Sequence, residues 1–412
     1  MFHQVVVVVL LLLVATTFNV AQGQETLIAG AATGVAGGGC SGGAYESINT
    51  DSLEAVFIFM RHGVRAPWTT YPKDPHINQT NRWPNGRSQL TSFGIKQVTN
   101  IGNLLNKRYG TFTRGLKRSQ IYQRASAAQR CIDTLKLVSS RLWPNFDNAH
   151  TPVIYSLPKK VDSLLYEEPK CPLAETEESN NINSAAVSAY ENQTDIKDLY
   201  AYVAENTGLP PTMSGVTKAF DCVRCDKING FKVPKWASVN NVYERMGNVY
   251  TKNLNFLYAT EKARRFRSGP IIQEVIDSIT AIKNTDEKDK ESIKRAYLYT
   301  THDYKIASLL LGLGEKLYKY PPFAATVIFE VHRDPLGTGD PIIRSYYISQ
   351  TVKEPYTIEQ LRLDKCLGNE FDCKFSNFVN TLKPLEGLQW SKECGLTNVD
   401  GFLLAEENIG DS

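Results

Sequence analysis

The sequence reads EAVFIFMRHGVRAP over residues 54–67. The apolar run that ends at Met60 is short, which predicts a buried β-strand. Directly after it, His62 stands beside Arg61 and three residues before Arg65. Each guanidinium offers a rigid fork of N–H donors that suits phosphate oxygens, and it keeps its charge at any relevant pH. We therefore expect a site for a tetrahedral anion at the end of this strand, with the imidazole as the group able to attack phosphorus.

The whole motif is more specific than its parts. A single His after a strand is more often a packed or surface residue, and two Arg residues at this spacing occur by chance on solvated surfaces. Residues 61–67, however, read R-H-G-x-R-x-P, with Gly63 allowing a close approach and Pro67 setting the exit of the loop. This string resembles the signature of the histidine acid phosphatases, the branch of the histidine phosphatases that includes prostatic and lysosomal acid phosphatases and phytases.

A second motif lies far downstream. Residues 297–300 predict another short strand, followed by His302, Asp303 and an apolar helix over 306–313 that is closed by Gly314. Alone, a His-Asp pair is more often a helix start with an Asp cap. The resemblance implies that His302 contacts the phosphate and that Asp303 protonates the leaving oxygen. In open α/β sheets ligands bind beyond the carboxyl ends of strands, so the two strand ends can form one pocket.

A third basic residue lies between these motifs. Residues 119–123 predict a strand, with Arg124 at its end and a helix over 125–142. The resemblance implies that Arg124 completes the phosphate clamp. The alternative is a surface Arg at a helix start, where the helix dipole disfavours a cation. The chain departs from the family in the residues around Arg124 and at Val64, where animal acid phosphatases commonly have Asp.

The N-terminus predicts the compartment. Residues 1–23 contain an apolar run of about ten residues followed by small residues, as in a secretory signal peptide, and this run is too short to span a membrane. We expect residues 24–50, which are rich in glycine, to form a flexible segment. The mature protein is then secreted or lies in the lysosomal lumen, has no membrane anchor and carries glycan at Asn78 and Asn192, the two N-x-Thr sequons. A net charge of +3 does not favour nucleic-acid binding.

Eight cysteines in a secreted chain predict mostly disulfides. Cys171 and Cys394 resemble the animal acid phosphatase pair that joins the middle of the chain to its C-terminus. Cys366 and Cys373 bracket a short loop and form a second expected pair.

The third pairing has a less direct basis. Cys225 matches a cysteine of the family, but the expected partner position lies within residues 321–327, where no cysteine occurs. Cys222 is the nearest replacement, so we expect a Cys222–Cys225 disulfide. A zinc site is the alternative, although no second ligand pair is evident. Cys40 and Cys131 are left over, either to pair with each other or to stay free.

The alternation of strands and helices over residues 53–142 predicts an α/β domain. Its first long helix follows residue 90, with Thr91 as the expected N-cap and Gly110 as the expected stop. Further strands are expected at 296–300, 326–331 and 342–348. The resemblance implies a mixed sheet flanked by helices, built from residues 51–157 and 291–412, with a smaller, mostly helical domain inserted at 158–290.

The resemblance also implies an enzyme that hydrolyses phosphate monoesters at acid pH through a phosphohistidine on His62, without a metal ion or cofactor. Small-molecule monoesters are the expected substrates, with phosphoproteins and a homodimer left open. The alternatives are a phytase or another phosphatase of narrow specificity, and an inactive relative that only binds at the phosphate site. A phosphomutase is less favoured, because secretion with disulfides does not suit intracellular sugar-phosphate metabolism.

Overall fold

The computed structural model of the protein describes residues 50–146, 150–167, 169–352, 356–363, 366 and 371–394. The predicted signal peptide (1–23), all but the last residue of the predicted glycine-rich segment (24–50) and Cys40 lie outside the described residues. Among the helices that the structure describes, none is both long enough and apolar enough to cross a membrane.

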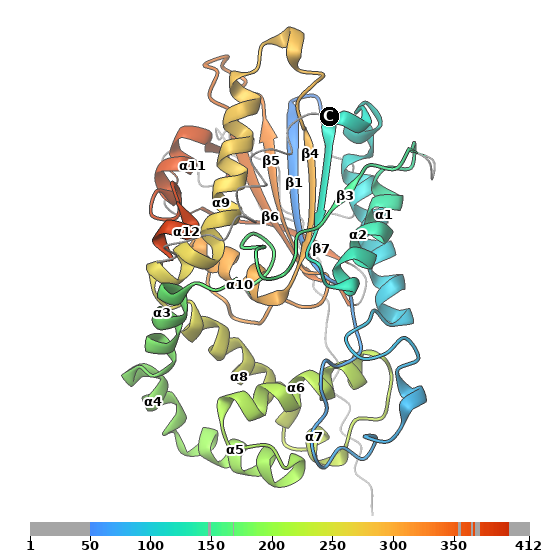
Figure 1. The fold of residues 1–412 in the computed structure, drawn as a ribbon, viewed down its shortest axis with the longest axis vertical. Helices are drawn as coiled ribbons and strands as arrows, with labels where there is room; N and C mark the ends of the chain where they lie inside the picture. The colour runs from blue at the N-terminus through green and yellow to red at the C-terminus, as the bar shows by residue number, and fades with distance from the viewer. Residues whose placement is uncertain are drawn as a thin grey trace, which may run out of the picture. The chain divides into compact units, whose positions relative to one another are not determined.

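The described residues form one mixed sheet of eight strands (Figure 1). The strands are β1 Leu53–Arg61, β2 Ile121–Ala125, β3 Ile154–Tyr155, β4 Ala296–Thr301, β5 Thr326–His332, β6 Ile342–Gln350, β7 Thr357–Gln360 and β8 Cys373–Lys374. Their order is β3-β2-β4-β1-β5-β6-β7, and β8 pairs with β6. Because β1 pairs in parallel with β4 and antiparallel with β5, the predicted mixed α/β sheet is confirmed.

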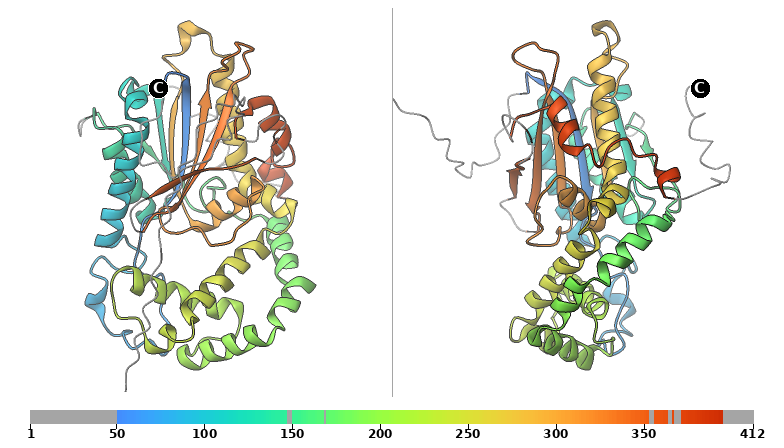
Figure 2. Two further views of the ribbon diagram at one scale, coloured as in Figure 1. Left: turned by 180° about the vertical axis from the view of Figure 1, so that it is seen from behind. Right: turned by 90° about the vertical axis from the view of Figure 1, so that its left-hand side faces the viewer.

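Helices cover both faces of this sheet (Figure 2). Helices α1 (Ser92–Arg114) and α2 (Gln129–Leu142) pack on one face. Helices α9 (Glu261–Asn284), α10 (Asp303–Gly312) and α11 (Phe375–Leu382) pack on the other. The domain is therefore a three-layer α/β sandwich with two hydrophobic cores.

Strand β1 separates these two cores, which explains the unbroken apolar run of residues 55–60 within it. Phe57 and Phe59 belong to the core beneath α9 and α10. Ile58 and Met60 belong to the core beneath α1 and α2. Successive side chains of a strand point to opposite faces, so a strand buried on both sides needs apolar residues at every position.

The first long helix runs beyond its predicted end. It begins as predicted, with the Thr91 side chain accepting a hydrogen bond from the backbone N–H of Gly94. However, Gly110 does not stop it, because α1 continues for another turn. Tyr109 and Thr113 are buried on either side of Gly110. Their packing offsets the cost of about 1 kcal/mol that a glycine brings to a helix interior.

A group of shorter helices lies beyond the end of the sheet at which α10 begins (Figure 1). Side chains of the helices from residue 185 to residue 257 form a third hydrophobic core. The α-helices of this part are α3 Pro172–Ile182, α4 Ala185–Glu191, α5 Thr194–Thr207, α6 Met213–Ile228, α7 Lys235–Ser238 and α8 Val242–Leu257. Short elements elsewhere are α12 Trp390–Glu393 and the 3₁₀ turns η1 Thr80–Arg82, η2 Arg118–Gln120 and η3 Glu287–Asp289. The domain boundaries at residues 158 and 290 remain predictions, and α9, which lies between them, packs on the sheet.

Two of the predicted disulfides are present. Cys171 pairs with Cys394, and Cys366 pairs with Cys373. The first joins the N-terminal end of α3 to the end of α12, across 223 positions of the sequence. Cys131 is a buried free thiol.

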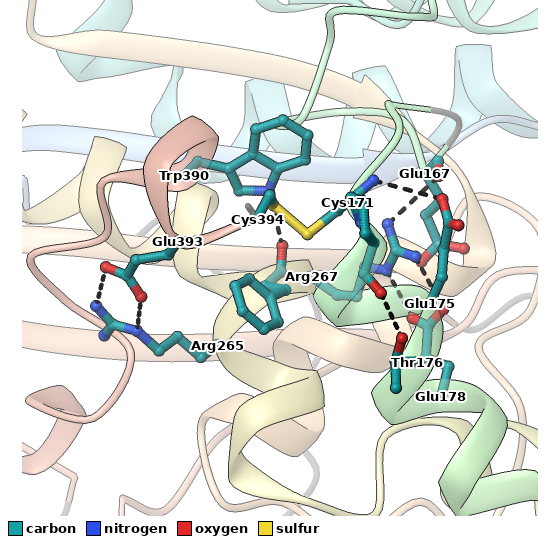
Figure 3. Close-up of a disulfide and its surroundings, with 12 residues drawn as sticks. Glu167, Cys171, Glu175, Thr176, Glu178, Arg265, Arg267, Trp390, Glu393 and Cys394 are labelled. Carbon is teal, nitrogen blue, oxygen red and sulfur yellow. Dashed lines mark hydrogen bonds and ion pairs between the residues drawn. A yellow bond between two sulfur atoms is a disulfide. The ribbon is translucent and has the colours of Figure 1, made fainter. Parts of the chain in front are cut away.

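The surroundings of the Cys171–Cys394 bridge are charged as well as apolar (Figure 3). Arg265 forms a two-pronged ion pair with Glu393, next to Cys394. Arg267 binds Glu178 of α3 in the same manner. These pairs fix both helices that the disulfide joins.

The predicted Cys222–Cys225 disulfide is wrong, because both residues are buried free thiols on α6. Their sulfur atoms have different neighbours. Cys222 Sγ donates to the Thr69 carbonyl oxygen at 3.3 Å, whereas Cys225 Sγ lies 3.8 Å from a guanidinium nitrogen of Arg65. Each thiol thus packs against a different part of the loop that follows β1.

Asn78 and Asn192, the residues of the two sequons, are exposed to solvent. Asn78 lies in the loop before η1, and Asn192 ends α4. Glycosylation at these positions remains a prediction.

Removal of the Cys171–Cys394 disulfide is expected to lower the free energy of unfolding by several kcal/mol. In the chain-entropy model, the stability lost with a disulfide grows with the logarithm of the number of residues in the loop that it closes. A disulfide that closes 223 residues therefore contributes more than one that closes 7. The difference between the two disulfides is about 3 kcal/mol on this basis. Urea unfolding of the double Ser variants Cys171→Ser/Cys394→Ser and Cys366→Ser/Cys373→Ser measures it. Equal destabilisation of the two variants would contradict the expectation.

Candidate active site

A cavity of about 620 Å³ lies at the carboxyl ends of β1 and β4, where α10 begins. Four of the six residues predicted at the phosphate site line it, namely His62, Arg65, His302 and Asp303. The first two follow β1, and the other two follow β4, its parallel neighbour. The cavity is thus where the two sequence motifs meet.

His62 is held with one ring nitrogen occupied and the other available. Its Nδ1 lies 2.9 Å from the carbonyl oxygen of Gly63, which can only accept, so Nδ1 carries the proton and Nε2 keeps its lone pair. Burial lowers the pKa of His62 well below its usual value, and the guanidiniums of Arg130, Arg61 and Arg65 lower it further. Both effects favour the neutral form of the His62 imidazole.

The loop that carries His62 is anchored by side chains from the two helices behind it. The N–H of Gly63 donates to Thr134 Oγ1 at 3.0 Å, and the N–H of Val64 donates to Gln97 Oε1 at 2.9 Å. A Cβ atom on Gly63 would lie 2.5 Å from Val98 of α1, so only glycine fits there. Val64 is fully buried and does not reach the cavity lining.

Arg61 lies behind the cavity wall and is fully buried. One guanidinium nitrogen donates to the carbonyl oxygen of Pro321 at 2.5 Å, and another lies 2.7 Å from Asp303 Oδ2 in an ion pair. The guanidinium carbon stands 4.2 Å from the centre of the Phe323 ring. Arg61 thus contributes its charge to the site while its geometry is fixed by three neighbours.

Arg65 enters the cavity and forms a two-pronged pair with Asp221 of α6, at 3.0 and 3.1 Å. Asp221 also accepts from Arg224 at 2.8 Å. Burial disfavours the carboxylate, but the two guanidiniums outweigh it and lower the pKa of Asp221 to about 2. A carboxyl whose pKa falls on folding contributes stability that is complete above its unfolded pKa and is lost as the pH falls through its folded pKa. The Arg65–Asp221 pair therefore stays ionised in mildly acidic solution.

His302 faces His62 across the cavity, with ring centres 5.6 Å apart. Its Nδ1 lies 3.3 Å from a guanidinium nitrogen of Arg130, and its Nε2 lies 2.9 Å from Ser126 Oγ. Because the Arg130 guanidinium can only donate, Nδ1 is the acceptor and Nε2 carries the proton. Burial lowers the pKa of His302 well below its usual value, and Arg130 adds to this effect. His302 is therefore also a neutral imidazole.

The structure corrects the third member of the predicted clamp. Arg124 is not among the residues that line the cavity; its guanidinium pairs at 2.7 Å with Asp162, which is fully buried. Along β2 the side chains alternate, so Arg124 and Tyr122 share one face of the strand. Arg130, in the first turn of α2, lines the cavity instead; the Nε atoms of both arginines are buried without a hydrogen-bond partner, so their position at the cavity is what separates them. A buried guanidinium nitrogen without a partner beside a cavity indicates a place for an anion.

Asp303 is held as a carboxylate. Its Oδ2 accepts a hydrogen bond from the Tyr250 hydroxyl at 2.7 Å and pairs with Arg61, and its Oδ1 accepts from the backbone N–H of Tyr304 at 3.2 Å. Burial raises the pKa of Asp303, but Arg61, Arg224 and the Tyr250 hydrogen bond together outweigh burial and lower it. In the absence of a bound anion, Asp303 is therefore ionised.

Several residues that line the cavity lie outside the predicted motifs. Arg130, Asp221, Arg224 and Tyr250 all line the cavity, and three of them belong to α6 and α8. For Arg130 a signal existed, since a cation in the first turn of a helix opposes the helix dipole and needs an anion to compensate. For the residues of α6 and α8 no local pattern pointed to the cavity.

The cavity combines guanidiniums, a neutral imidazole with a free ring nitrogen and a carboxyl group. Guanidiniums fixed in this way stabilise the charge spread over a phosphoryl group during its transfer. The imidazole can accept the group, and the carboxyl can move a proton at the leaving oxygen. The arrangement suits phosphoryl transfer.

Comparison with known proteins agrees with this chemistry. Residues 52–348 match the model of the Histidine phosphatase superfamily (branch 2). Lysosomal acid phosphatase of Xenopus laevis is 27% identical over 372 residues, which cover 87% of this chain and 81% of the relative. Prostatic acid phosphatase of Homo sapiens is 26% identical over 368 residues, covering 86% and 90% of the two chains.

Solved structures share the fold at lower identity. The phytase from Citrobacter braakii superposes with a TM-score of 0.64 at 18% identity, covering 83% of this chain and 99% of the phytase chain. The likeness of the structures concerns the fold, whereas the family model spans both the RHG motif after β1 and the His-Asp pair after β4. On this evidence the chain belongs to the histidine phosphatase superfamily, branch 2.

Proposed function

We propose that the protein is an acid phosphatase that hydrolyses phosphate monoesters through a phosphohistidine on His62. The observation that carries the proposal is the state of this side chain. Its Nδ1 is bound to the carbonyl of Gly63, and its Nε2 is free in a cavity lined by Arg65, Arg130 and His302. The relatives named acid phosphatases support the same activity.

In the first step, Nε2 of His62 attacks phosphorus and the bond from phosphorus to the leaving oxygen breaks. The electron pair of that bond goes to the leaving oxygen, which takes a proton from Asp303. Arg65, Arg130 and Arg61 offset the negative charge on the phosphoryl oxygens. In the second step, Asp303, now ionised, takes a proton from water as the water oxygen bonds to phosphorus and the N–P bond breaks.

The proton on Asp303 depends on the bound substrate. In the structure, without a bound anion, the neighbouring guanidiniums keep the pKa of Asp303 below its usual value. A bound phosphate offsets those charges and raises the pKa, so the carboxyl is protonated more readily in the complex. The lowered pKa of His62 favours the neutral imidazole that attacks phosphorus. Together these effects favour activity in acid solution.

Phosphate release by the purified protein tests the proposal. The substrates are nitrophenyl phosphate, an alkyl phosphate, phosphotyrosine, a nucleotide and phytate, measured across pH with His62→Ala as the control. Hydrolysis of several monoesters with loss of activity in His62→Ala supports a general acid phosphatase. Turnover confined to phytate would instead make the protein a phytase, and phosphate binding without turnover would make it an inactive relative.

We also propose that the protein is secreted or lysosomal and carries glycan at Asn78 and Asn192. The two disulfides and the exposure of both asparagines support this location. The relatives include enzymes named lysosomal and prostatic acid phosphatase. A decrease in the mass of the secreted protein after removal of N-linked glycan, abolished in Asn78→Gln/Asn192→Gln, tests the proposal.

Asp303→Asn is expected to slow the phosphorylation step far more for an alkyl phosphate than for nitrophenyl phosphate. An alkoxide needs a proton as it leaves, whereas nitrophenolate is stable without one. Single-turnover rates of the folded variant with both substrates measure the difference. If Asp303 only stabilises the first turn of α10 through the N–H of Tyr304, both rates stay near normal and stability alone falls, by about 0.5–2 kcal/mol. Equal slowing of both substrates would remove Asp303 from proton transfer.

A further inference from the structure

Tyr250 brings a hydroxyl group from the helical part of the protein to Asp303. It lies in α8, lines the cavity and is 7% exposed. Its hydroxyl donates to Asp303 Oδ2 at 2.7 Å. Burial and the nearby Asp303 carboxylate raise the pKa of Tyr250 well above its usual value, so the phenol keeps its proton throughout the working range.

The two oxygens of Asp303 have unequal surroundings. Oδ2 is occupied by the Tyr250 hydroxyl and by the Arg61 guanidinium, each at 2.7 Å. Oδ1 accepts the weaker backbone N–H of Tyr304, at 3.2 Å. A proton placed on Oδ2 would face two donors, whereas a proton placed on Oδ1 would displace one weak contact.

Other charged groups surround this carboxyl. Arg224 of α6 and Arg65 of the loop after β1 act on it from the side of the cavity, and His302 precedes it in the chain. Arg224 also stands 5.5 Å from the Tyr250 ring centre. These groups act by charge over a distance, whereas Tyr250 makes a direct hydrogen bond.

We propose that Tyr250 is a positioning residue for the proton transfer carried out by Asp303. It holds Oδ2, so that Oδ1 carries and delivers the proton, and it stabilises the ionised carboxylate that acts as base in the second step. This inference rests on the proposed function. It adds a residue from the helical part of the chain to the proton transfer, outside both sequence motifs.

Loss of the hydroxyl is expected to affect the two chemical steps in opposite directions. A hydrogen bond donated to a carboxylate favours the ionised form, so Tyr250→Phe raises the pKa of Asp303, by about one unit. Phosphorylation by an alkyl phosphate needs the protonated form, so the alkaline limb of its single-turnover rate at saturating substrate moves to higher pH. Hydrolysis of the phosphoenzyme needs the ionised form, so that step slows by up to about tenfold at pH values below the pKa of Asp303 in the phosphoenzyme.

The experiment compares Tyr250→Phe with Tyr243→Phe. Tyr243 lies on the same helix and in the same aromatic cluster, since both residues pack on Phe220. Acid quench during turnover of nitrophenyl phosphate measures how much phosphoenzyme accumulates. Single-turnover rates of an alkyl phosphate, measured across pH, give the pH at which the alkaline limb falls. We expect more phosphoenzyme and a limb at higher pH in Tyr250→Phe, with both unchanged in Tyr243→Phe.

A second variant covers the case in which Tyr250→Phe folds poorly. Difluorotyrosine at position 250 keeps the volume of the ring but makes the hydroxyl a stronger donor, so the limb should move to lower pH. A role in packing alone predicts no shift with difluorotyrosine and equal loss of both steps in Tyr250→Phe, and either result overturns the inference. Inactivity of the wild-type protein would refute the proposed function itself, whereas these results on an active wild type refute only the role of Tyr250.

Discussion

His62→Ala is expected to lower the turnover of phosphate monoesters by about 10,000-fold or more, because no other group replaces the attacking nitrogen. His62 Nε2 keeps a free lone pair, since Nδ1 is bound to the carbonyl of Gly63. The nearest imidazole, His302, is bound at both of its nitrogens. Phosphate binding should survive in part, because Arg65 and Arg130 remain. Steady-state turnover and phosphate affinity of the folded variant measure the two effects separately.

The trapped intermediate gives an independent check. Acid quench of the wild-type protein during turnover of a labelled monoester should leave phosphate on His62, and peptide mapping identifies the residue. His302 and Ser126 are the neighbouring groups that could carry the label instead, and Ser126 Oγ lies 2.9 Å from His302. Label on either residue would falsify the assignment of His62 as nucleophile.

Arg130→Ala and Arg124→Ala are expected to have different effects. Arg130 lines the cavity, so its loss should lower kcat/KM by about 100- to 1,000-fold, as for other groups that stabilise the transition state. Arg124 pairs with the fully buried Asp162, so its loss should leave an uncompensated charge and cost about 3–5 kcal/mol of stability. Kinetics of the folded fraction and urea unfolding of both variants separate catalysis from stability.

A double variant provides the control for Arg124. Arg124→Met/Asp162→Leu removes both charges and should recover most of the stability lost in Arg124→Ala, because no unpaired charge is left inside the protein. Turnover of the double variant should stay near that of the wild type. A loss of turnover comparable to that of Arg130→Ala would show that Arg124 takes part in phosphate binding after all.

Local sequence patterns determined the elements that carry the two motifs. The apolar run before Arg61 predicted a strand buried on both faces, and β1 is such a strand. The strand before His302 and the helix that follows Asp303 were predicted in the same way, as β4 and α10. These predictions succeed because the alternation of a strand and the start of a helix depend mainly on residues that are neighbours in sequence. The mixed character of the sheet and the pairing of Cys171 with Cys394 came from the family resemblance, because pairing between distant segments leaves no local pattern.

Tertiary structure decided which side chains reach the cavity. Arg124 and Arg130 are six positions apart; the sequence placed Arg124 at the phosphate site, whereas Arg130 is the one that lines the cavity. The position of the Arg124 guanidinium depends on its ion pair with Asp162, a partner 38 residues away. Tyr250 and Asp221 belong to helices whose packing against α10 and the loop after β1 is set by long-range contacts. A local pattern determines whether a residue lies on a strand or a helix, but the direction of its side chain toward a shared cavity depends on partners that only the folded chain brings together.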